Sequence, residues 1–384
     1  MTHRLFYDDA YIEKFTARVL SCTTADGKYR AVLDKTAFFP EGGGQPGDKG
    51  FIGGVRVIDT VESGDDVIHV CEGEIAEGEY ECTLDFAARF LNMQQHTGEH
   101  VFSGIIHRLT GLDNVGFHMG SQAVTVDFNG EVDAEILEQA ERESNEAVYA
   151  NIPVEVLLPT AEELESFDYR SKKELSGQVR LVKIGGYDLC ACCGTHVART
   201  GEIGIIKVVD VMNYKQGVRI TLQIGKKAVE DYDKKLNSVR KISALLCAKP
   251  NEVAEATVKL EESMRAIKSE LSAMRRRLFA RMCNEIESGT SVCIFEENLE
   301  ANEVRELCDM LCGKAGVAAV FSGAEGAYKY AVGSRDTDIR EIGKKLNELC
   351  NGRGGGKPQM VQGSVCSTRE KIEEVFSMLT NCPE

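Results

Sequence analysis

Two pairs of potential metal ligands, far apart in the chain, place the strongest constraint on how this protein can fold. His96 and His100 are four residues apart in a stretch whose apolar residues have helical spacing, so both imidazoles share one helix face. Cys192 and His196 follow with C-x-x-x-H spacing. Three imidazoles and one thiolate suit a tetrahedral Zn²⁺ ion. We therefore expect these two distant segments to fold together around one zinc ion.

The cysteines next to Cys192 leave the choice of the fourth ligand open. Cys190 and Cys193 are close enough in the sequence to compete for the ion, although the spacing to His196 favours Cys192. The alternative interpretation is a buried thiol and a structural histidine. The 14 cysteines are otherwise scattered over 384 residues, so we expect reduced thiols instead of a disulfide framework.

Changes in hydrophobic period divide the chain into four expected domains, and the expected fold class is α+β. Residues 1–89 have short alternating stretches with Gly-rich turns, which are typical of a small β-barrel. Residues 90–228 mix helical and alternating stretches, which predicts an α+β domain that holds the zinc. Residues 229–288 predict a helical hairpin or coiled-coil arm. Residues 289–384 predict a small α/β domain with a Gly-rich loop before its last helix.

Charge is distributed unevenly along the chain. The net charge is −16, and residues 229–384 carry 23 Lys and Arg against 25 Asp and Glu, which leaves −14 for the first 228 residues. A polyanionic partner should therefore contact the C-terminal part and local basic clusters. The sequence has no apolar stretch near the ~20 residues that cross a bilayer. Its first residues also differ from a signal peptide. We expect a cytoplasmic protein with no membrane partner.

Several motifs resemble those of one known family. The segments TAFFPEGGGQPGD at 36–48, HTGEH at 96–100, GFHMG at 116–120 and CCGTHVARTGEIG at 192–204 are similar to the alanyl-tRNA editing family. That family includes free-standing AlaX-type proteins and the editing domain of alanyl-tRNA synthetase. A further segment, GRGGGKPQMVQG at 352–363, resembles the glycine-rich signature of the DHH-associated domain, which indicates the long AlaX type. One departure is Cys193, where the family usually has glycine.

The resemblance implies a trans-editing hydrolase that removes a wrong amino acid from tRNA(Ala), with serine as the first expected substrate and glycine as the second. It implies Zn²⁺ as the cofactor, and tRNA contact or a homodimer through the C-terminal half. Consecutive glycines also let backbone N–H groups approach a phosphate, although a flexible turn is the alternative. The expected tRNA contacts are Gly42, Gly43, Gly44 and Gln45 in the first Gly-rich segment and Arg353, Gly354, Gly355, Gly356 and Lys357 in the second.

Ester hydrolysis needs a water nucleophile, a proton acceptor and a group that stabilises the oxyanion. Four protein ligands would close the zinc ion, so either Cys192 leaves it or the ion organises the pocket. Glu99 and His118 are candidates to orient the water, and a helix-surface carboxylate is the alternative for Glu99. Thr36 is the candidate partner for the serine hydroxyl, unless it caps its own backbone.

Two other functions are also compatible with the sequence. The segment His96-Thr-Gly-Glu-His100 also satisfies H-x-x-E-H, a zinc-peptidase signature with Glu99 as general base. That signature leaves Cys192 and His196 unexplained. The second alternative is a zinc-stabilised RNA-binding module without catalysis.

Overall fold

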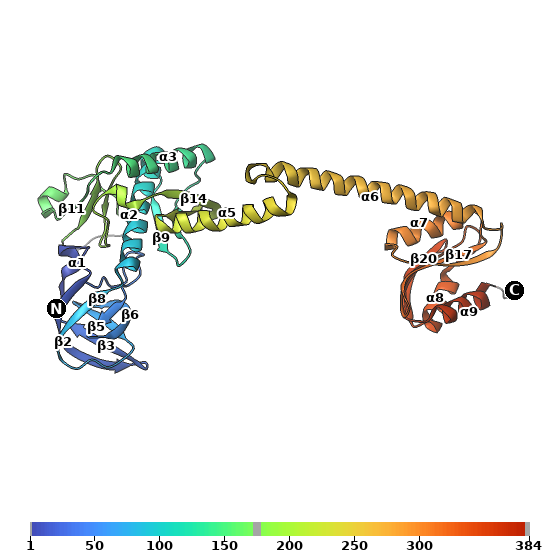
Figure 1. Cartoon of the computed structure of the whole chain (residues 1–384), viewed down its shortest axis with the longest axis horizontal. Helices are drawn as coiled ribbons and strands as arrows, with labels where there is room; N and C mark the ends of the chain where they lie inside the picture. Colours follow the sequence, from blue (N-terminus) through green and yellow to red (C-terminus); the bar gives the residue numbers. More distant parts are fainter. Residues whose placement is uncertain (1, 172–177, 381–384) are drawn as a thin grey trace. The chain divides into compact units, whose positions relative to one another are not determined.

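The computed structural model describes residues 2–171 and 178–380, which fall into two units divided between Ile242 and Ser243 (Figure 1). The first unit contains a β-barrel and a mixed region of helices and sheets, and the second contains a long helix and a five-stranded sheet with helices. The predicted α+β class is therefore confirmed. The finer boundaries at residues 89, 228 and 288 stay predictions.

Six strands close the barrel in the order β2-β3-β7-β6-β5-β8. Along β7 every second residue is buried, namely Val67, His69 and Cys71, because one face of each strand meets the barrel interior. The strands are β2 (Lys14–Ala25), β3 (Lys28–Leu33), β5 (Gly50–Ile52), β6 (Val55–Ser63), β7 (Asp66–Cys71) and β8 (Gly78–Leu84). Before them come α1 (Leu5–Asp8) and β1 (His3–Arg4), which pairs with β4 (Lys35–Thr36).

The helix α2 (Phe86–Thr110) carries the H-T-G-E-H segment. It begins where the Asp85 carboxylate accepts a hydrogen bond from the Ala88 N–H, and it ends at Gly111, whose φ of 73° is left-handed. A Cβ on Gly104 would lie 2.3 Å from the backbone oxygen of Tyr187. The glycine thus allows α2 to pack directly on the loop that precedes β13 (Asp188–Ala191).

Two sheets and a helix surround α2. The four-stranded sheet has the order β14-β15-β10-β9, and the three-stranded sheet has the order β11-β12-β13. Because α2 contacts β13, the chain that follows β13 lies next to the middle of α2. The remaining bounds are β9 (Asn114–Met119), β10 (Val124–Phe128), α3 (Ala134–Ala150), β11 (Val154–Leu157), α4 (Ala161–Leu164), β12 (Leu181–Ile184), β14 (Ile206–Tyr214) and β15 (Gly217–Ile224).

A buried ion pair joins the barrel to α2. The Arg89 guanidinium lies on Asp48, with its Nε 2.8 Å from a carboxylate oxygen, and it also donates to the carbonyl oxygens of Ala10 (2.9 Å) and Ala37 (2.5 Å). A buried charge is tolerated only when it is paired and hydrogen-bonded in this way. The pair therefore fixes the segment around Asp48, which follows the first Gly-rich segment, against α2.

The second unit has a sheet in the order β16-β17-β18-β20-β19. Helix α6 (Val253–Asn284) precedes it, and its strands alternate with α7 (Ala301–Leu311), α8 (Arg340–Leu349) and α9 (Arg369–Thr380). The strands are β16 (Ser291–Glu296), β17 (Val317–Ala324), β18 (Ala327–Gly333), β19 (Gly352–Lys357) and β20 (Met360–Val365). The prediction of a Gly-rich loop in residues 352–357 is therefore wrong, because this segment is an edge strand.

The close approach of two backbones explains that strand. A Cβ on Gly354 would lie 2.4 Å from the carbonyl oxygen of Gln362 on β20, and one on Gly356 would lie 2.2 Å from that of Met360. These glycines therefore allow the two strands of the hairpin to pack closely.

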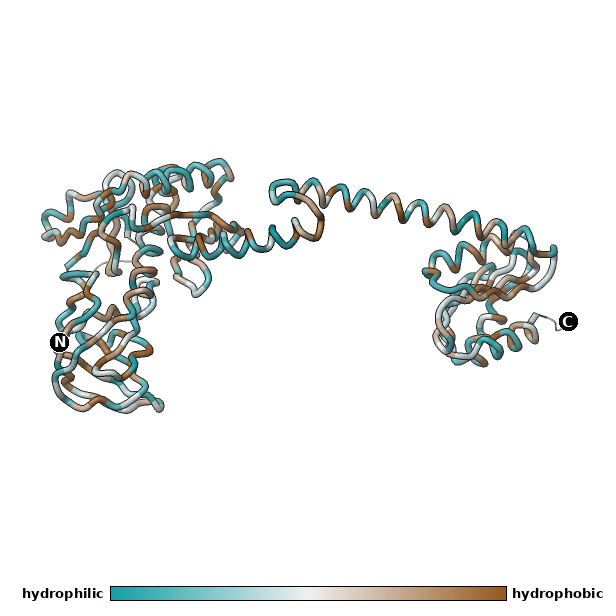
Figure 2. The backbone as a smooth tube through the Cα atoms, viewed as in Figure 1, coloured by the Kyte–Doolittle hydropathy of each residue, from teal (hydrophilic) through white to brown (hydrophobic). Residues whose placement is uncertain are grey.

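Between the two sheet regions the chain forms α5 (Lys226–Leu246) and α6, separated by a short 3-10 turn at Pro250–Glu252. Pro250 occupies the first position of that turn, where its missing N–H is tolerated. Hydrophobic residues recur along α6 (Figure 2), and several of them are exposed. The antiparallel pairing of α5 with α6 stays a prediction.

Candidate metal centre

Four predicted ligands lie together in the first unit. Helix α2 presents His96 and His100, whose ring centroids are 5.2 Å apart, and the loop after β13 adds Cys192 and His196. One ligand atom from each residue lies within 4.8 Å of each of the others. The three histidines are buried, so a cation here would be shielded from water by protein on most sides.

The Nδ1 atom of each histidine faces a hydrogen-bond partner that fixes the ring. Gln45 Oε1 lies 3.0 Å from His96 Nδ1, and Asp188 Oδ2 lies 2.9 Å from His100 Nδ1. The third partner is Thr97, whose Oγ1 is 3.2 Å from the Nδ1 of His196. Each Nδ1–H therefore donates to a neighbour, which leaves the three Nε2 atoms for a metal ion. This is the arrangement that orients metal-binding histidines.

The sulfur position also fits a zinc ion. Cys192 Sγ is 3.4 Å from Nε2 of both His96 and His196, and it accepts the Gly194 N–H at 3.3 Å. A tetrahedral Zn²⁺ with Zn–N of about 2.1 Å and Zn–S of about 2.3 Å separates two such atoms by about 3.6 Å. The four residues therefore suit zinc in donor type and in spacing.

Protonation in the cluster agrees with a thiolate among imidazoles. Burial raises the pKa of the Cys192 thiol, but the positive charges of the neighbouring histidines, His96 first and then His100, outweigh it and hold the pKa well below 9.0. Burial and the charge of His96 lower the pKa of His196 to about 3. His196 is thus neutral at pH 7, as a metal-binding imidazole must be.

Two arginines support the ligand cluster, one at each ligand pair. The Nη1 group of Arg180 donates to the carbonyl oxygens of Cys192 (2.8 Å) and Gly194 (3.1 Å). Arg170 Nε donates to the second carboxylate oxygen of Asp188 at 2.8 Å, so Asp188 bridges an arginine and His100. Both arginines and Asp188 lie outside the sequence predictions, because they have no fixed spacing to the ligands.

The neighbouring cysteines lie differently from Cys192. Cys190 is buried, and with His100 and Asp188 it forms a second group that could hold a metal ion. Asp188 is already bonded to His100 and Arg170, so this group lacks the freely directed ligand atoms of the first. Cys193 is exposed and belongs to neither group. The geometry therefore favours Cys192, as the spacing predicted.

Glu99 is not on the helix surface, so that alternative is wrong. Its side chain is fully buried, with a relative exposure of 0%. Its Oε1 accepts hydrogen bonds from Ser103 Oγ (2.6 Å) and Asn114 Nδ2 (2.5 Å). These bonds connect α2 to the start of β9. A catalytic role for Glu99 stays a prediction.

The structure gives the other two catalytic candidates separate surroundings. His118 is exposed on the edge strand β9, whereas its neighbour Phe117 stacks on the His96 ring with centroids 5.1 Å apart. Successive strand residues point to opposite faces, so His118 points away from His96.

Thr36 is buried in the barrel: its hydroxyl lies 2.8 Å from His69 Nε2 and accepts from the Phe38 N–H at 3.1 Å. Both catalytic roles stay predictions.

The first Gly-rich segment lies against this cluster. Gly42 pairs with Gln45 in a tight turn, and Gly43 and Gly44 both have positive φ. A Cβ on Gly44 would lie 2.6 Å from the Phe117 ring. Gln45 is buried, and its amide also bonds Thr195 through Oγ1 (2.8 Å) and N–H (3.1 Å). In this structure Gln45 supports His96 instead of presenting its amide to solvent.

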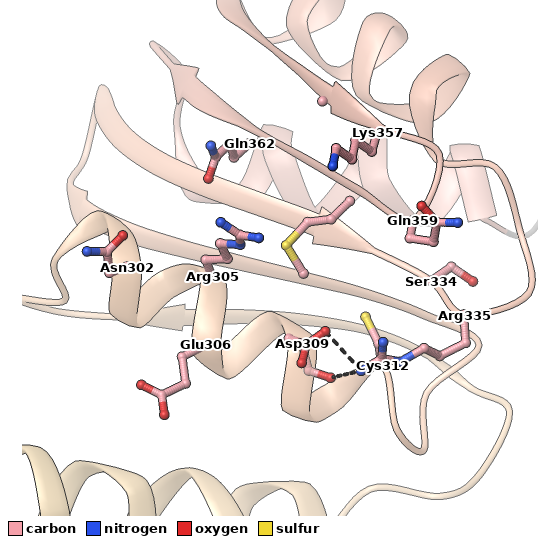
Figure 3. Close-up of a pocket in the computed structure, with 12 residues that line it drawn as sticks. Asn302, Arg305, Glu306, Asp309, Cys312, Ser334, Arg335, Lys357, Gln359 and Gln362 are labelled. Carbon is pink, nitrogen blue, oxygen red and sulfur yellow. Dashed lines mark hydrogen bonds and ion pairs between the residues drawn. The ribbon is translucent and has the colours of Figure 1, made fainter.

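The second Gly-rich segment borders a different cavity. Arg353, Gly354, Gly355, Gly356 and Lys357 are exposed on β19. Lys357 faces a pocket of about 640 Å³ between α7 and the β19–β20 hairpin, together with Arg305 and Gln362 (Figure 3). Arg335 also borders it but is paired with Asp309 at 2.9 Å. Basic and amide groups thus gather beside this strand.

No helix in residues 2–171 and 178–380 combines the length and the apolar character needed to cross a bilayer.

Comparison with known proteins gives matches along most of the chain. Residues 179–223 match the threonyl and alanyl tRNA synthetase second additional domain, and residues 289–382 match the DHHA1 domain. Alanyl-tRNA editing protein AlaX-L of Pyrococcus horikoshii is 29% identical over 98% of this chain and 97% of its own length. Alanyl-tRNA editing protein Aarsd1 of Danio rerio is 25% identical over 95% of this chain and 94% of its own.

Longer proteins match through part of their length. The alanine–tRNA ligase of Pyrococcus abyssi is 29% identical over 98% of this chain, which spans 44% of the ligase. The solved C-Ala domain of Aquifex aeolicus alanyl-tRNA synthetase covers 25% of this chain at 23% identity and a TM-score of 0.22, too weak a likeness to inform the fold. Over nearly its whole length, the chain is thus a relative of the alanyl-tRNA editing proteins of the long AlaX type.

Proposed function

We propose that this protein is an aminoacyl-tRNA deacylase that acts in trans on mischarged tRNA(Ala), with seryl ester as the preferred substrate and glycyl ester as the second. The observation that carries the proposal is the meeting of His96, His100, Cys192 and His196, with one ligand atom from each within 4.8 Å of the others. The relatives that match over nearly their full length are alanyl-tRNA editing proteins, which supports the same reaction class.

The cofactor in this proposal is Zn²⁺. When bound, zinc polarises a carbonyl or lowers the pKa of a bound water towards about 7. The chain's own residues keep the site in shape. Gln45, Thr97 and Asp188 orient the three imidazoles, and Arg180 holds the backbone on both sides of Cys193. Four protein ligands suit an ion that organises the pocket, unless Cys192 departs when substrate binds.

Selectivity has a physical basis in the hydroxyl of serine. A site that hydrogen-bonds a substrate hydroxyl rejects an analogue without it by ~10⁴–10⁵. Alanine lacks that hydroxyl, so the cognate ester survives. This contact accounts for the removal of serine only, because glycine lacks the hydroxyl too. We keep Thr36 as the proposed partner. Its hydroxyl now bonds His69 and the Phe38 N–H, so serine would have to exchange with one of these bonds.

The test is a deacylation assay on Ser-, Gly- and Ala-tRNA(Ala), with zinc content measured on the same preparations. The wild type should remove serine fastest and spare alanine. Cys192→Ala should lose zinc and activity together. Cys193→Ala is the matched control, because Cys193 is the next residue but is exposed and outside the cluster. A zinc-replete wild type that left seryl ester intact would contradict the proposal.

The same preparations separate the two other candidate functions. Cleavage of peptides without deacylation would support the metallopeptidase that the H-x-x-E-H spacing suggests. Retention of Ser-tRNA(Ala) without turnover would support a zinc-stabilised RNA-binding module. Against the peptidase stands the placement of Cys192 and His196 in the ligand cluster, which the H-x-x-E-H signature leaves unexplained.

A further inference from the structure

Two cysteines of the second unit lie together at the end of α7. Cys308 is in the last turn of the helix, and Cys312 caps it, with its N–H 3.0 Å from the Cys308 carbonyl oxygen. Residues four apart share one face of a helix. A Cβ on Gly333 of β18 would lie 2.7 Å from Cys312 Sγ and 3.2 Å from Cys308 Sγ. The absence of a side chain at Gly333 thus leaves one space that both sulfur atoms share.

The two thiols differ in access to solvent. Cys308 is 0% exposed, and its Sγ donates to the Ala318 carbonyl oxygen at 3.5 Å. Cys312 is 4% exposed and lines the pocket of about 640 Å³ that Arg335 and Lys357 also border (Figure 3). A small reagent in this pocket therefore reaches Cys312 first, and Cys308 lies behind it. An accessible thiol with a second thiol next to it is typical of redox-active cysteines.

The surroundings of Cys312 favour its reactive form. Donation from the Cys308 thiol lowers the pKa of Cys312 below 9.0, and the positive charge of Arg335 lowers it further, against the opposing effect of burial. In the barrel, by contrast, burial raises the pKa of Cys71 and of Cys82 to about 12. Because the thiolate is the form that attacks an oxidant, Cys312 should react before the barrel cysteines.

The end of α7 can accommodate a bond between the two sulfurs. A disulfide needs Cβ atoms about 3.5–4.5 Å apart, whereas positions i and i+4 of a helix place them about 5–6 Å apart. The two Cβ atoms must therefore approach each other by about 1–2 Å. Cys312 is the cap residue and is followed by Gly313, so the last turn can tighten while the turns that bury Val304 and Leu307 keep their packing.

We propose that Cys308 and Cys312 are a reversible oxidation site, which a hydroperoxide such as hydrogen peroxide converts to an intramolecular disulfide. The Cys312 thiolate attacks one peroxide oxygen, the O–O bond breaks, and the sulfur becomes a sulfenic acid while hydroxide leaves. The Cys308 sulfur then attacks the Cys312 sulfur, the S–O bond breaks, and the sulfenic hydroxyl leaves with the Cys308 proton as water.

This sequence is balanced in atoms and electrons. The hydroxide from the first step takes up the proton that Cys312 released on ionisation. One hydrogen peroxide is thus reduced to two waters, and two thiols are oxidised to one disulfide. A thiol reductant returns both cysteines to the reduced form. The chemistry is independent of the proposed deacylase activity.

Peptide mapping of the full-length, zinc-loaded protein tests the proposal. Trypsin releases both cysteines on one peptide, residues 306–314, because Arg305 precedes it and Lys314 ends it. The protein is treated with a small molar excess of hydrogen peroxide and alkylated with iodoacetamide in denaturant before digestion. The peptide should lose both alkyl groups and be lighter by two hydrogen atoms than its reduced, unalkylated form. Dithiothreitol before alkylation should restore both alkyl groups.

The barrel cysteines are the internal control in the same digest. Cys71 and Cys82 also share one tryptic peptide, residues 57–89, and both are buried. This peptide should stay fully alkylated at the peroxide dose that oxidises residues 306–314. Full alkylation of residues 306–314 after peroxide would overturn the proposal, and so would equal oxidation of the two peptides.

Single variants test which sulfur is attacked first. Cys308→Ser should stop at a sulfenic acid on Cys312, which dimedone traps. Cys312→Ser should leave Cys308 unmodified, because the Cys308 side chain is 0% exposed. Thermal unfolding shows whether each variant is folded, and the wild-type peptide map decides the proposal without them. Equal dimedone labelling of the two folded variants would overturn the assignment of Cys312 as the attacking thiol.

Discussion

The two glycine-rich segments of this protein, residues 42–45 and 352–357, are alike in composition but differ in structure. The first is a tight turn packed on the metal centre, with Gly44 against Phe117 and Gln45 on His96. The second is an exposed edge strand paired with β20. A run of glycines therefore indicates that the backbone approaches another group closely. The surrounding fold determines whether that group is an aromatic ring beside a metal ligand or a neighbouring strand.

Replacing one glycine in each segment should give the largest contrast. Gly44→Ala places a Cβ 2.6 Å from the Phe117 ring and 2.8 Å from its carbonyl oxygen, at a φ of +84°. Overpacking and a strained φ together should lower the free energy of unfolding by about 2–4 kcal/mol. Since Phe117 stacks on His96, zinc content should fall as well. Thermal unfolding and metal analysis measure both effects.

Gly355→Ala is the control for that experiment. A Cβ at Gly355 meets no atom within 4 Å, and its φ is not in the left-handed region. Stability should change by less than about 0.5 kcal/mol. Equal effects of the two substitutions would show that the packing difference between the segments is not present in solution.

The first segment should also be the more sensitive to acid, because the strand end that leads into it is tied to a buried histidine. His69 bonds Thr36, and burial lowers its pKa from 6.5 to about 4. Between pH 4 and pH 6.5, His69 therefore binds a proton in the unfolded chain but stays neutral in the folded chain. The stability that His69 contributes is complete above pH 6.5 and is lost as pH falls towards 4. At pH 4.5 the loss should be about 2.5 kcal/mol.

Urea unfolding at pH 7 and pH 4.5 tests this, with His69→Gln as the comparison. The variant should be less stable at pH 7 but should lose less on acidification. The difference between the two proteins isolates His69, because metal release affects both alike. Parallel pH profiles would show that His69 is protonated in the folded barrel.

Gln45 of the first segment bonds a metal ligand directly. Gln45→Leu removes the acceptor for His96 Nδ1–H and both bonds to Thr195, so zinc affinity should fall by about 10- to 100-fold. Competition with a chromogenic chelator measures this. Gln95→Leu is the control, because within residues 2–171 and 178–380 the Gln95 amide donates to the Leu91 carbonyl of its own helix and to no metal ligand. If zinc affinity is unchanged in Gln45→Leu, the tRNA contact first expected for Gln45 becomes the better explanation.

The ligand pairs were predictable because their signal is local. The spacings of His96 to His100 and of Cys192 to His196 are properties of short segments, and the structure brings all four together. The groups that orient them were not predictable in the same way. Gln45, Thr97 and Asp188 come from three separate parts of the chain, and their bonds to the histidines exist only after those parts have packed.

The same reasoning explains why the strand at 352–357 was missed. Glycine disfavours strands in general, so a run of glycines predicts a loop. Here the pairing partner also contains a glycine: a Cβ on Gly354 would lie 2.8 Å from the Cα of Gly363, and one on Gly363 would lie 2.7 Å from the Cα of Gly354. This reciprocal contact is a matched pair of glycines nine residues apart, a signal that is visible only once a hairpin is considered.

The smallest expected effect concerns the second segment and its proposed tRNA contact. Lys357 is exposed beside Arg305 and Gln362, so one phosphate contact is the most its side chain can add (Figure 3). Lys357→Ala should weaken tRNA(Ala) binding by about fivefold and reduce the slope of log affinity against log salt by about 1. Zinc content should not change.

Lys371→Ala is the control, because Lys371 is an exposed lysine on α9 that does not line this pocket. Equal losses in both variants would indicate general charge attraction, and no loss in Lys357→Ala would leave the edge strand with a role in packing alone.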